Sequence, residues 1–299
     1  MKNKNSICFL VLLPSIAWVQ NTFLVSKQVF DSQDKKVLPY TAISVKNTKI
    51  ATYSDEQGIF NINCKESDTL QFSSVGYRIA EIPLSKILNK DSIFLNQSNT
   101  MLGEIVITND TKKTKTEWIG YAKKKASGTY IGFQETAVWI ENPYKTPLSI
   151  MSIRSMIEKR RIVFASSGEL LKNKKILVRL RLYAKNLLNL PSNEDILTEN
   201  LIAEVDVNQK EINFDMRNLA MTLPKNGVFV SLEFLGVITE NNEFISYEKL
   251  SKIEKQQFQI KLTKVEIPES FARDLKGNWT PTVIRGNFRF GIQVAILEQ

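Results

Sequence analysis

Apolar and polar side chains alternate with a period of two along much of this chain, and this alternation constrains its fold more than any other feature. In KILVRLRLY, residues 175–183, apolar positions alternate with Arg179, Arg181 and Tyr183. Successive side chains of a β-strand point to opposite faces of a sheet, so the period predicts strands with one buried face. Several such segments lie within 118–299, and none with a helical period lies within 23–108. The chain is therefore predicted to be all-β.

The chain is predicted to divide into two β-sandwich domains. Short strand-like segments with turns about every eight to twelve residues occupy 21–108, and this spacing is typical of a sandwich. The segment 109–117, NDTKKTKTE, is polar and basic and is predicted to be a linker. The longer alternating segments of 118–299 predict a second sandwich of jelly-roll type.

The segment YSDEQGIFNI, residues 53–62, places acidic residues and a glycine between two strand-like segments. Ser54 and Asp55 can accept hydrogen bonds from the following backbone amides, and Gly58 can adopt the positive φ that reverses the chain. A calcium loop would need oxygen ligands at alternating positions, whereas Asp55 and Glu56 are neighbours. The segment is predicted to be a hairpin turn rather than a metal site.

Two stretches of the first part carry a family resemblance. KKVLPYTAISVKNTKIATYSDEQGIFNI and DTLQFSSVGYRIAEIPL resemble the carboxypeptidase-regulatory-like domain, a transthyretin-like (prealbumin-like) β-sandwich common in envelope proteins of Gram-negative bacteria. The matching positions are Pro39, Tyr40, Ala42, Asp55, Gly58, Phe60, Ser74, Gly76 and Tyr77. The resemblance implies a fold and an envelope location. It does not imply peptidase activity, because the chain lacks the zinc ligands that this activity needs.

Within this resemblance, Gly76 and Tyr77 have structural roles. Gly76 lets the backbone turn sharply after LQFSSV, and the Tyr77 ring can cover the edge of the sandwich while its hydroxyl stays in water. The segment SNTMLGEIVIT, residues 98–108, resembles the strand that closes this domain.

The chain contains no histidine, which excludes several reaction classes. Of its 299 residues, 40 are Lys or Arg and 31 are Asp or Glu. Nucleophiles activated by imidazole and histidine-rich zinc sites are excluded, while carboxylate and calcium chemistry remain open. Cys64 has no imidazole to activate it and is predicted to be a packed structural thiol.

The first twenty residues, 1–20, have the pattern of a secretory signal peptide. Two lysines precede an apolar run too short to span a membrane, and small residues precede a possible cleavage site. Loss of Lys2 and Lys4 would lower the net charge from +9 to +7. We expect a soluble exported protein without a transmembrane segment in the mature chain, located in the periplasm, at the outer-membrane periphery or on the cell surface. Nucleic acid is not an expected partner, because the basic residues are spread along the chain.

Arg179, Arg181 and Tyr183 are candidate ligand-binding residues because they share the polar face of one strand. In one interpretation this face is solvated, and its arginines form cross-strand ion pairs with residues such as Glu204 and Glu233. In the other, the three side chains line a concave, exposed face that binds a polar ligand such as a sugar. Alternation alone favours the first interpretation.

The connection 184–200 is longer than a tight hairpin and contains Glu194 and Asp195. Long connections at the end of a sandwich often carry ligand sites, so both carboxylates are candidate ligand-binding residues. Their residue types also make Ca²⁺ a possible ligand. Their adjacency does not establish the separation that a pair of catalytic carboxylates needs.

These observations predict a non-catalytic exported envelope protein that acts as a binding or scaffold module, with an envelope protein or a glycan as its partner. No catalytic residue and no cofactor is assigned. One alternative is a carbohydrate-binding module that uses the exposed sheet face or the 184–200 connection. Another is a carboxylate-based glycoside hydrolase. The second half resembles, more loosely, the C-terminal β-sandwich of other exported bacterial proteins, and this supports architecture more than activity.

Overall fold

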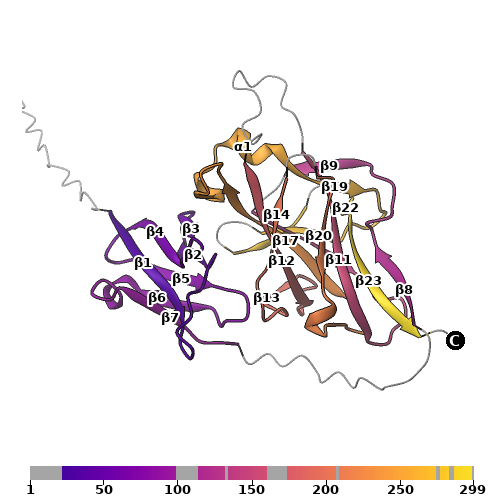
Figure 1. Cartoon of the computed structure of the whole chain (residues 1–299), viewed down its shortest axis with the longest axis horizontal. Coiled ribbons are helices and arrows are strands. Elements are labelled where there is room, and N and C mark those ends of the chain that lie inside the picture. Colours follow the sequence, from indigo (N-terminus) through magenta and orange to yellow (C-terminus); the bar gives the residue numbers. More distant parts are fainter. Residues whose placement is uncertain are drawn as a thin grey trace, which may run out of the picture.

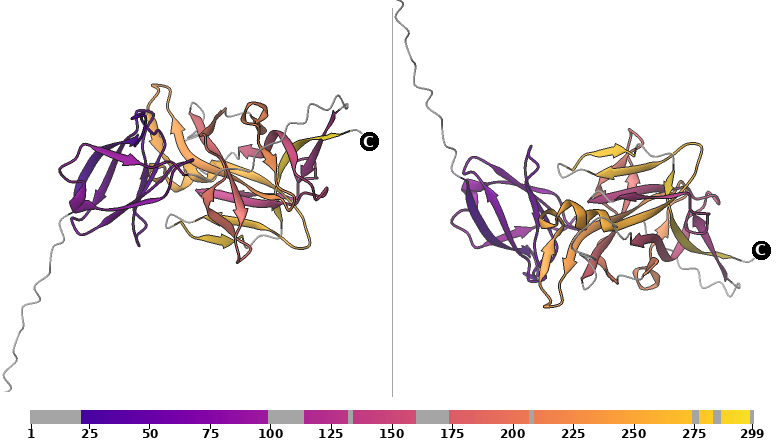
Figure 2. Two further views of the ribbon diagram at one scale, coloured as in Figure 1. Left: turned by 90° about the horizontal axis from the view of Figure 1, so that it is seen from below. Right: turned by 90° about the horizontal axis from the view of Figure 1, so that it is seen from above.

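Strands make up nearly all regular structure in this protein. The computed structural model describes residues 22–98, 114–131, 134–159, 174–206, 209–273, 277–282 and 286–297. Across these ranges the strands form two units that lie side by side in each view (Figures 1 and 2). The helical elements described are α1 (Lys252–Gln257) and the 3-10 turns η1 (Leu84–Lys86), η2 (Arg217–Leu219) and η3 (Tyr247–Lys249). The all-β prediction is confirmed.

The N-terminal unit is built from a three-stranded sheet, in the order β4-β1-β7, and a four-stranded sheet, in the order β3-β2-β5-β6. Residues alternate strictly between exposed and buried in β4, as a strand with one face on a core requires. The strands are β1 (Phe23–Asp31), β2 (Ala42–Val45), β3 (Ala51–Tyr53), β4 (Ile59–Cys64), β5 (Thr69–Ser73), β6 (Ala80–Pro83) and β7 (Ser92–Leu95).

The two N-terminal sheets bury a common core. Phe60 of β4 and Phe72 of β5 meet edge to face with ring centroids 5.7 Å apart. Cys64 lies in the same core as a buried free thiol, and burial raises the pKa of Cys64 to about 11. A thiol in this environment stays protonated at neutral pH, so the predicted packing role of Cys64 is confirmed.

The segment from Tyr53 to Ile62 contains the predicted turn but not the predicted hairpin. Asp55 Oδ1 accepts hydrogen bonds from the amides of Gln57 and Ile59, both at 2.9 Å, and Gly58 has a φ of +74°. However, β3 pairs with β2, whereas β4 pairs with β1 in the other sheet. The segment therefore crosses between sheets, and the hairpin prediction was wrong.

The Ser54 hydroxyl supplies a physical reason for this crossing. Its Oγ accepts the Thr41 amide at 2.9 Å and donates to the Leu38 carbonyl at 3.0 Å, instead of capping its own turn. These bonds fix the end of β3 to the connection before β2. The turn residues in the sequence indicate that the chain bends here, but they do not indicate which strands pair after the bend.

The C-terminal unit contains two sheets of eight strands each. One has the order β13-β12-β17-β10-β20-β21, with β14 beside β12 and β18 beside β17. We call it the first sheet, and its strands are β10 (Glu135–Ile140), β12 (Lys175–Lys185), β13 (Pro191–Asp195), β14 (Leu201–Val205), β17 (Val228–Ile238), β18 (Phe244–Ser246), β20 (Ser270–Arg273) and β21 (Trp279–Pro281).

The other C-terminal sheet, the second sheet, has the order β22-β19-β11-β23-β8, with β15 and β16 beside β11 and β9 beside β19. Its strands are β8 (Thr114–Gly120), β9 (Gly128–Ile131), β11 (Leu148–Lys159), β15 (Glu211–Asp215), β16 (Thr222–Leu223), β19 (Phe258–Thr263), β22 (Asn287–Phe288) and β23 (Phe290–Leu297).

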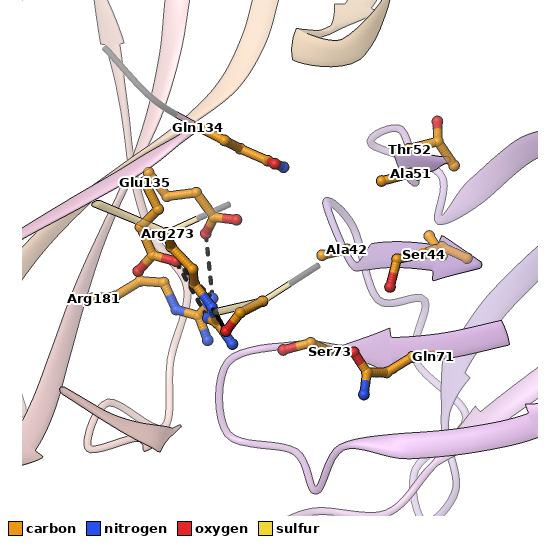
Figure 3. A pocket seen from close by; sticks show the side chains of 13 residues that line it. Ala42, Ser44, Ala51, Thr52, Gln71, Ser73, Gln134, Glu135, Arg181 and Arg273 are labelled. Atoms are coloured by element: carbon orange, nitrogen blue, oxygen red, sulfur yellow. Dashed lines mark hydrogen bonds and ion pairs between the residues drawn. The ribbon is translucent and has the colours of Figure 1, made fainter. Parts of the chain in front are cut away.

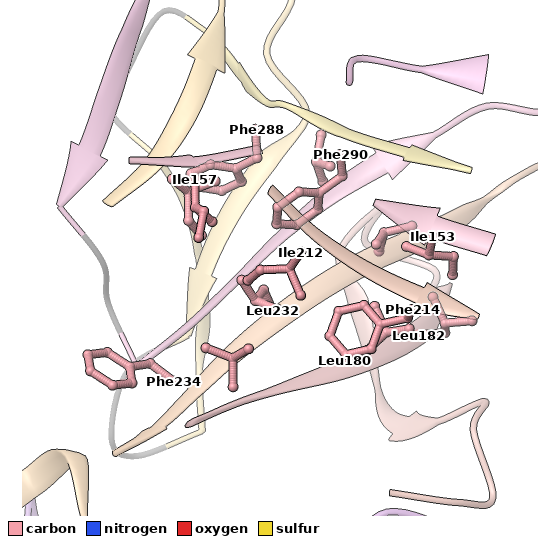
Figure 4. Packing of buried hydrophobic residues seen from close by; sticks show 14 of the residues in the cluster. Ile153, Ile157, Leu180, Leu182, Ile212, Phe214, Leu232, Phe234, Phe288 and Phe290 are labelled. Carbon is pink, nitrogen blue, oxygen red and sulfur yellow. The ribbon is translucent and has the colours of Figure 1, made fainter. Parts of the chain in front are cut away.

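The inner faces of these two sheets form one apolar core (Figure 4). Leu180 and Leu182 of the first sheet lie in the same buried cluster as Ile153, Phe214 and Phe290 of the second. The alternation seen in the sequence therefore identifies the inner face of the first sheet correctly. Two facing sheets around one core make the second predicted sandwich.

Three sequence predictions concern segments that lie at or beyond the ends of the described ranges. Strand β8 begins at Thr114, inside the predicted linker 109–117, so the second domain starts earlier than predicted. The predicted signal peptide, 1–20, lies outside the described residues, as do 109–113 and nearly all of 98–108. In the parts of the chain that the structure describes, no helix is both long and apolar enough to cross a membrane.

Candidate functional site

The outer face of the first sheet is buried, contrary to the prediction. Arg179, Arg181 and Tyr183 of β12 are 0%, 3% and 0% exposed. The N-terminal unit covers the end of this face that carries Arg179, and Trp279 of β21 packs against the Tyr183 ring with centroids 5.5 Å apart. The exposed ligand-binding face predicted from these residues was therefore wrong, because a neighbouring domain and a curled sheet edge cover it.

Arg179 and Glu233 connect the two units directly. They are register partners on β12 and β17, and Arg179 Nε donates to Glu233 Oε2 at 2.9 Å. From the N-terminal unit, the Tyr53 hydroxyl donates to Glu233 Oε1 at 2.5 Å, and the Tyr40 carbonyl accepts from Arg179 Nη1 at 2.9 Å. The predicted cross-strand ion pair exists, but it is buried and lies between domains rather than in solvent.

The environment of Glu233 keeps its carboxylate ionised. Burial alone would raise the pKa of Glu233, but the positive charges of Arg179 and Arg181 outweigh it and, with the hydrogen bond from Tyr53, lower this pKa to about 2. Burial and the charge of Glu233 raise the pKa of Tyr53 well above its usual value. The Tyr53 hydroxyl therefore stays protonated and donates a hydrogen bond to Glu233 across the interface.

Arg181 links Glu233 to a second carboxylate. Its Nε donates to Asp195 Oδ2 at 2.9 Å, and its Nη1 lies 3.5 Å from Glu233 Oε2. Asp195 Oδ1 also accepts the amides of Leu182 and Leu197. Because Asp195 is held from three directions, its carboxylate has little capacity left for a ligand.

Glu135 completes this arrangement from β10. Its Oε1 accepts hydrogen bonds from the Tyr183 hydroxyl at 2.6 Å and from Ser231 Oγ at 2.7 Å, and its Oε2 lies 3.3 Å from Arg273 Nη1. Three guanidinium groups and three carboxylates thus interleave beneath the N-terminal unit. We call this set the charged junction, and its members are Glu135, Arg179, Arg181, Asp195, Glu233 and Arg273.

A small hollow lies between part of the charged junction and the N-terminal unit (Figure 3), beside the direct contacts of Arg179 and Glu233. Glu135, Arg181 and Arg273 lie on one side, while Ser44 and Ser73 lie among small and polar residues of the four-stranded sheet on the other. Its volume is about 60 Å³. That is room for a few water molecules, whereas pockets for small organic ligands usually measure roughly 300–1,000 Å³.

Gly76 allows the two units to approach closely. Its φ is +80°, and a Cβ added there would lie 2.4 Å from the Thr198 carbonyl oxygen of the C-terminal unit. The sharp turn predicted at Gly76 is confirmed, while its role in the contact between domains was missed. No local pattern indicates that contact, because Thr198 is more than a hundred residues away.

The Tyr77 hydroxyl is not solvated in the way the sequence suggested. It donates to Oδ2 of the buried Asp31 at 2.6 Å, and Gln97 donates to the same oxygen. These hydrogen bonds, that of Tyr77 above all, lower the pKa of Asp31 to about 2 although burial acts in the opposite direction. Tyr77 therefore fastens the end of β1 rather than only covering an edge.

The predicted ligand pair Glu194 and Asp195 does not converge. The connection 184–200 contains a hairpin, in which β13 pairs with β12 and Asn186 accepts the amides of Leu188 and Leu190. Asp195 points to the charged junction, whereas its neighbour Glu194 is exposed. Within the described ranges, no group of three or more His, Cys, Asp or Glu side chains is placed to hold a metal ion.

Glu248 adds a titratable group beside the junction that sequence reasoning missed. The amide of Gln134 donates both to Glu248 Oε1 at 3.0 Å and to the Tyr53 hydroxyl at 2.5 Å. Burial raises the pKa of Glu248 to about 7, with a smaller contribution from the charge of Glu233 and opposition from Lys255. The chain of contacts from Glu248 to Glu233 therefore passes through Tyr53 of the other domain.

Comparison with known proteins identifies the N-terminal unit. The curated proteins contain no match to this chain. The family model of the CarboxypepD_reg-like domain matches residues 25–107 and covers the seven strands of the N-terminal unit apart from the start of β1, while the C-terminal sandwich is unassigned. Residues 25–107, which form the N-terminal sandwich, are therefore similar to the CarboxypepD_reg-like family, in agreement with the resemblance seen in the sequence.

Proposed function

We propose that this is a non-catalytic exported envelope protein in which two β-sandwiches act as one binding or scaffold module. The observation that carries the proposal is the charged junction, because its charged side chains join two domains. Arg179 alone contacts Glu233, Asn200 and the Tyr40 carbonyl. The charge pairs lie within the C-terminal unit, and the Tyr53 hydroxyl and the Tyr40 carbonyl of the N-terminal unit bind to them. Buried hydrogen bonds to charged groups favour one relative position of the two domains, which suits a module that acts by contact.

The carboxylates of the charged junction are poorly suited to acid–base catalysis. Glu233, with a pKa of about 2, stays ionised and cannot donate a proton near neutral pH. Glu135 accepts from Tyr183 and Ser231, and Asp195 accepts from Arg181 and two amides. The hollow beside them is too small for a sugar ring.

Export is supported by the signal-peptide pattern of residues 1–20. It is also supported by the carboxypeptidase-regulatory-like domain at 25–107, since the resemblance to that family implies an envelope location. The positive net charge favours association with anionic envelope surfaces. The partner would be an envelope protein or a glycan.

One observation favours a glycoside hydrolase as a second candidate. Glu248 has a pKa of about 7 and Glu233 one of about 2, and a pair of carboxylates with separated pKa values is what such an enzyme uses. Against this candidate, Glu233 is 3% exposed and ion-paired with two arginines. Release of reducing sugar from polysaccharides, abolished in Glu248→Gln, would support the hydrolase.

Cell fractionation and cross-linking of the full chain, carrying a C-terminal affinity tag in a Gram-negative host, test the proposed function. We expect the protein in the envelope fraction, shortened by loss of the signal peptide and cross-linked to envelope components. Full-length protein retained in the cytosol would contradict export. An exported protein with neither cross-linked protein nor bound glycan would contradict the binding role.

A further inference from the structure

Strands β8, β11 and β23 of the second sheet lie on the side of the molecule away from the N-terminal unit (Figure 1), and strand pairing aligns one largely polar row of residues across this sheet. Pairing places Trp118 of β8 beside Gln293 of β23, Gln293 beside Ser152 of β11, and Ser152 beside Asp215 of β15. The next residues along these strands are buried in the core, as shown by Ile153. The row therefore lies on the face opposite the core on four neighbouring strands, with Ser152 buried at 7% exposure and Trp118 and Gln293 half-buried.

A hollow of about 290 Å³ lies along this row. We call it the polar groove. It approaches the size of small-ligand pockets and is several times larger than the hollow at the charged junction. Its polar lining consists of Thr116, Ser152, Asn213, Asp215, Arg217 and Gln293.

Hydrogen bonds hold the floor of the polar groove in a defined orientation. Ser152 Oγ donates to Gln293 Oε1 at 3.0 Å, and Gln293 Nε2 donates to Thr116 Oγ1 at 3.2 Å. The Gln293 amide is thus fixed on both sides, so little side-chain entropy remains to be lost when a ligand binds. Fixed amides and hydroxyls offer both donors and acceptors to a ligand.

The charges in the polar groove cancel locally. Arg217 Nε donates to both oxygens of Asp215, at 2.9 and 3.1 Å, and hydrogen bonding to Arg217 lowers the pKa of Asp215 to about 2. An anionic ligand would meet the Asp215 carboxylate, and a cationic one would meet Arg217. A neutral ligand with many hydroxyl groups meets neither penalty and can form hydrogen bonds with the polar groups of Thr116, Asn213 and Gln293 that line the groove.

Trp118 ends the row outside the residues that line the groove. It is half-buried, and the Arg154 guanidinium stacks 4.3 Å from its ring centroid. The hydroxyl, amide and paired charged groups that do line the groove suit the hydroxyl-rich surface of a sugar. We infer that the polar groove binds a neutral oligosaccharide. This inference rests on the proposed binding role and places the glycan site on the second sheet rather than on the Arg179 face.

An array of neutral and acidic oligosaccharides, probed with the purified mature chain, tests this inference. We expect binding to neutral members, with an affinity that changes little as salt increases because the groove has no net charge. The neutral oligosaccharide with the strongest signal is then titrated calorimetrically against three proteins, namely wild type, Asn213→Ala and Asn61→Ala. Asn213 and Asn61 are both exposed and alternate with buried residues in the middle of a strand, so they form a matched pair.

Loss of one neutral hydrogen-bonding group should weaken binding by about threefold to tenfold in Asn213→Ala. Asn61→Ala should bind like wild type, and both variants should keep the wild-type unfolding midpoint. Exclusive binding of acidic glycans, equal affinities of all three proteins, or an array with no signal would each overturn the inference. If the array gives no signal while envelope proteins are still cross-linked to the chain, only the groove assignment fails. If neither is found, the proposed binding role fails as well.

Discussion

The outer faces of the two C-terminal sheets carry polar side chains of similar chemistry, but one face is buried and the other is exposed. On the first sheet, Arg181 and Glu233 are buried beneath the N-terminal unit, with 3% of each exposed. On the second, Asp215 and Arg217 form an ion pair with 52% and 67% of their side chains exposed. Buried charges must be paired to be tolerated, whereas exposed charges are solvated whether or not they pair. A polar strand face can therefore be either an interface between domains or a surface exposed to solvent.

The sharpest contrast between the two faces should appear when one carboxylate is removed from each. Glu233→Ala leaves Arg179 and Arg181 without their shared partner, and we expect it to lower the free energy of unfolding by about 3–5 kcal/mol. Asp215→Ala, the matched exposed case, should leave the free energy of unfolding nearly unchanged. Urea unfolding of both variants measures the difference. Equal losses would show that the buried pair has no special energetic role.

A second comparison concerns the close approach at Gly76. In Gly76→Ala the new Cβ would meet the Thr198 carbonyl, and the positive φ would be strained. We expect a loss of about 1–3 kcal/mol, together with faster proteolysis between the domains. Gly128→Ala is the control, because a Cβ there meets nothing within 4 Å, and it should be neutral or slightly stabilising. Equal behaviour of the two variants would contradict the close contact.

Glu248 gives the buried side a pH dependence between about pH 4.5 and 7, whereas Asp215 on the exposed side, with a pKa of about 2, titrates at lower pH. Its folded pKa of about 7 exceeds its ordinary value of 4.5, so the folded state binds this proton more tightly than the unfolded state. The contribution of Glu248 to stability should therefore decrease as pH rises from about 4.5 to about 7, and then level off. Glu248→Gln should remove this decrease, and should be more stable than wild type by about 3 kcal/mol at pH 8, the free energy that corresponds to the shift from 4.5 to about 7.

Urea unfolding of wild type and Glu248→Gln at a series of pH values measures this effect. A difference between the two proteins that stays constant from pH 4 to pH 8 would show that Glu248 titrates normally. At lower pH both should lose stability, since Asp31 and Glu233 have depressed pKa values near 2 and lose their favourable charged forms as pH falls towards that value.

Sequence patterns predicted much of this architecture because strand periodicity is a local property. The alternation around Arg179 identified β12 and its apolar inner face, and it indicated the cross-strand ion pair between Arg179 and Glu233. In the N-terminal half, turn residues and a family resemblance identified a sandwich that the family model independently matches at 25–107. In each case the deciding residues lie close together in the chain.

The errors concern relations between distant residues. Tyr53 and Glu233 lie 180 positions apart, and nothing in either segment indicates that they share a hydrogen bond. The same holds for the crossing after β3, where strand pairing depends on the Ser54 contacts with the preceding connection. Alternation separates the two faces of a strand, but it does not show what covers either face. For that reason Arg179, Arg181 and Tyr183 were expected in solvent.

The central claim is that the polar face of the first sheet joins the two domains through Tyr53, Arg179 and Glu233. A double-mutant cycle between Tyr53→Phe and Glu233→Ala, followed by urea unfolding, measures this coupling directly, because the two residues belong to different domains and each substitution removes the hydrogen bond between them. We predict a coupling energy of about 1–2 kcal/mol, as expected for residues that share a buried hydrogen bond. Additive effects, with a coupling energy near zero, would show that the domains are not joined through this contact and would contradict the account.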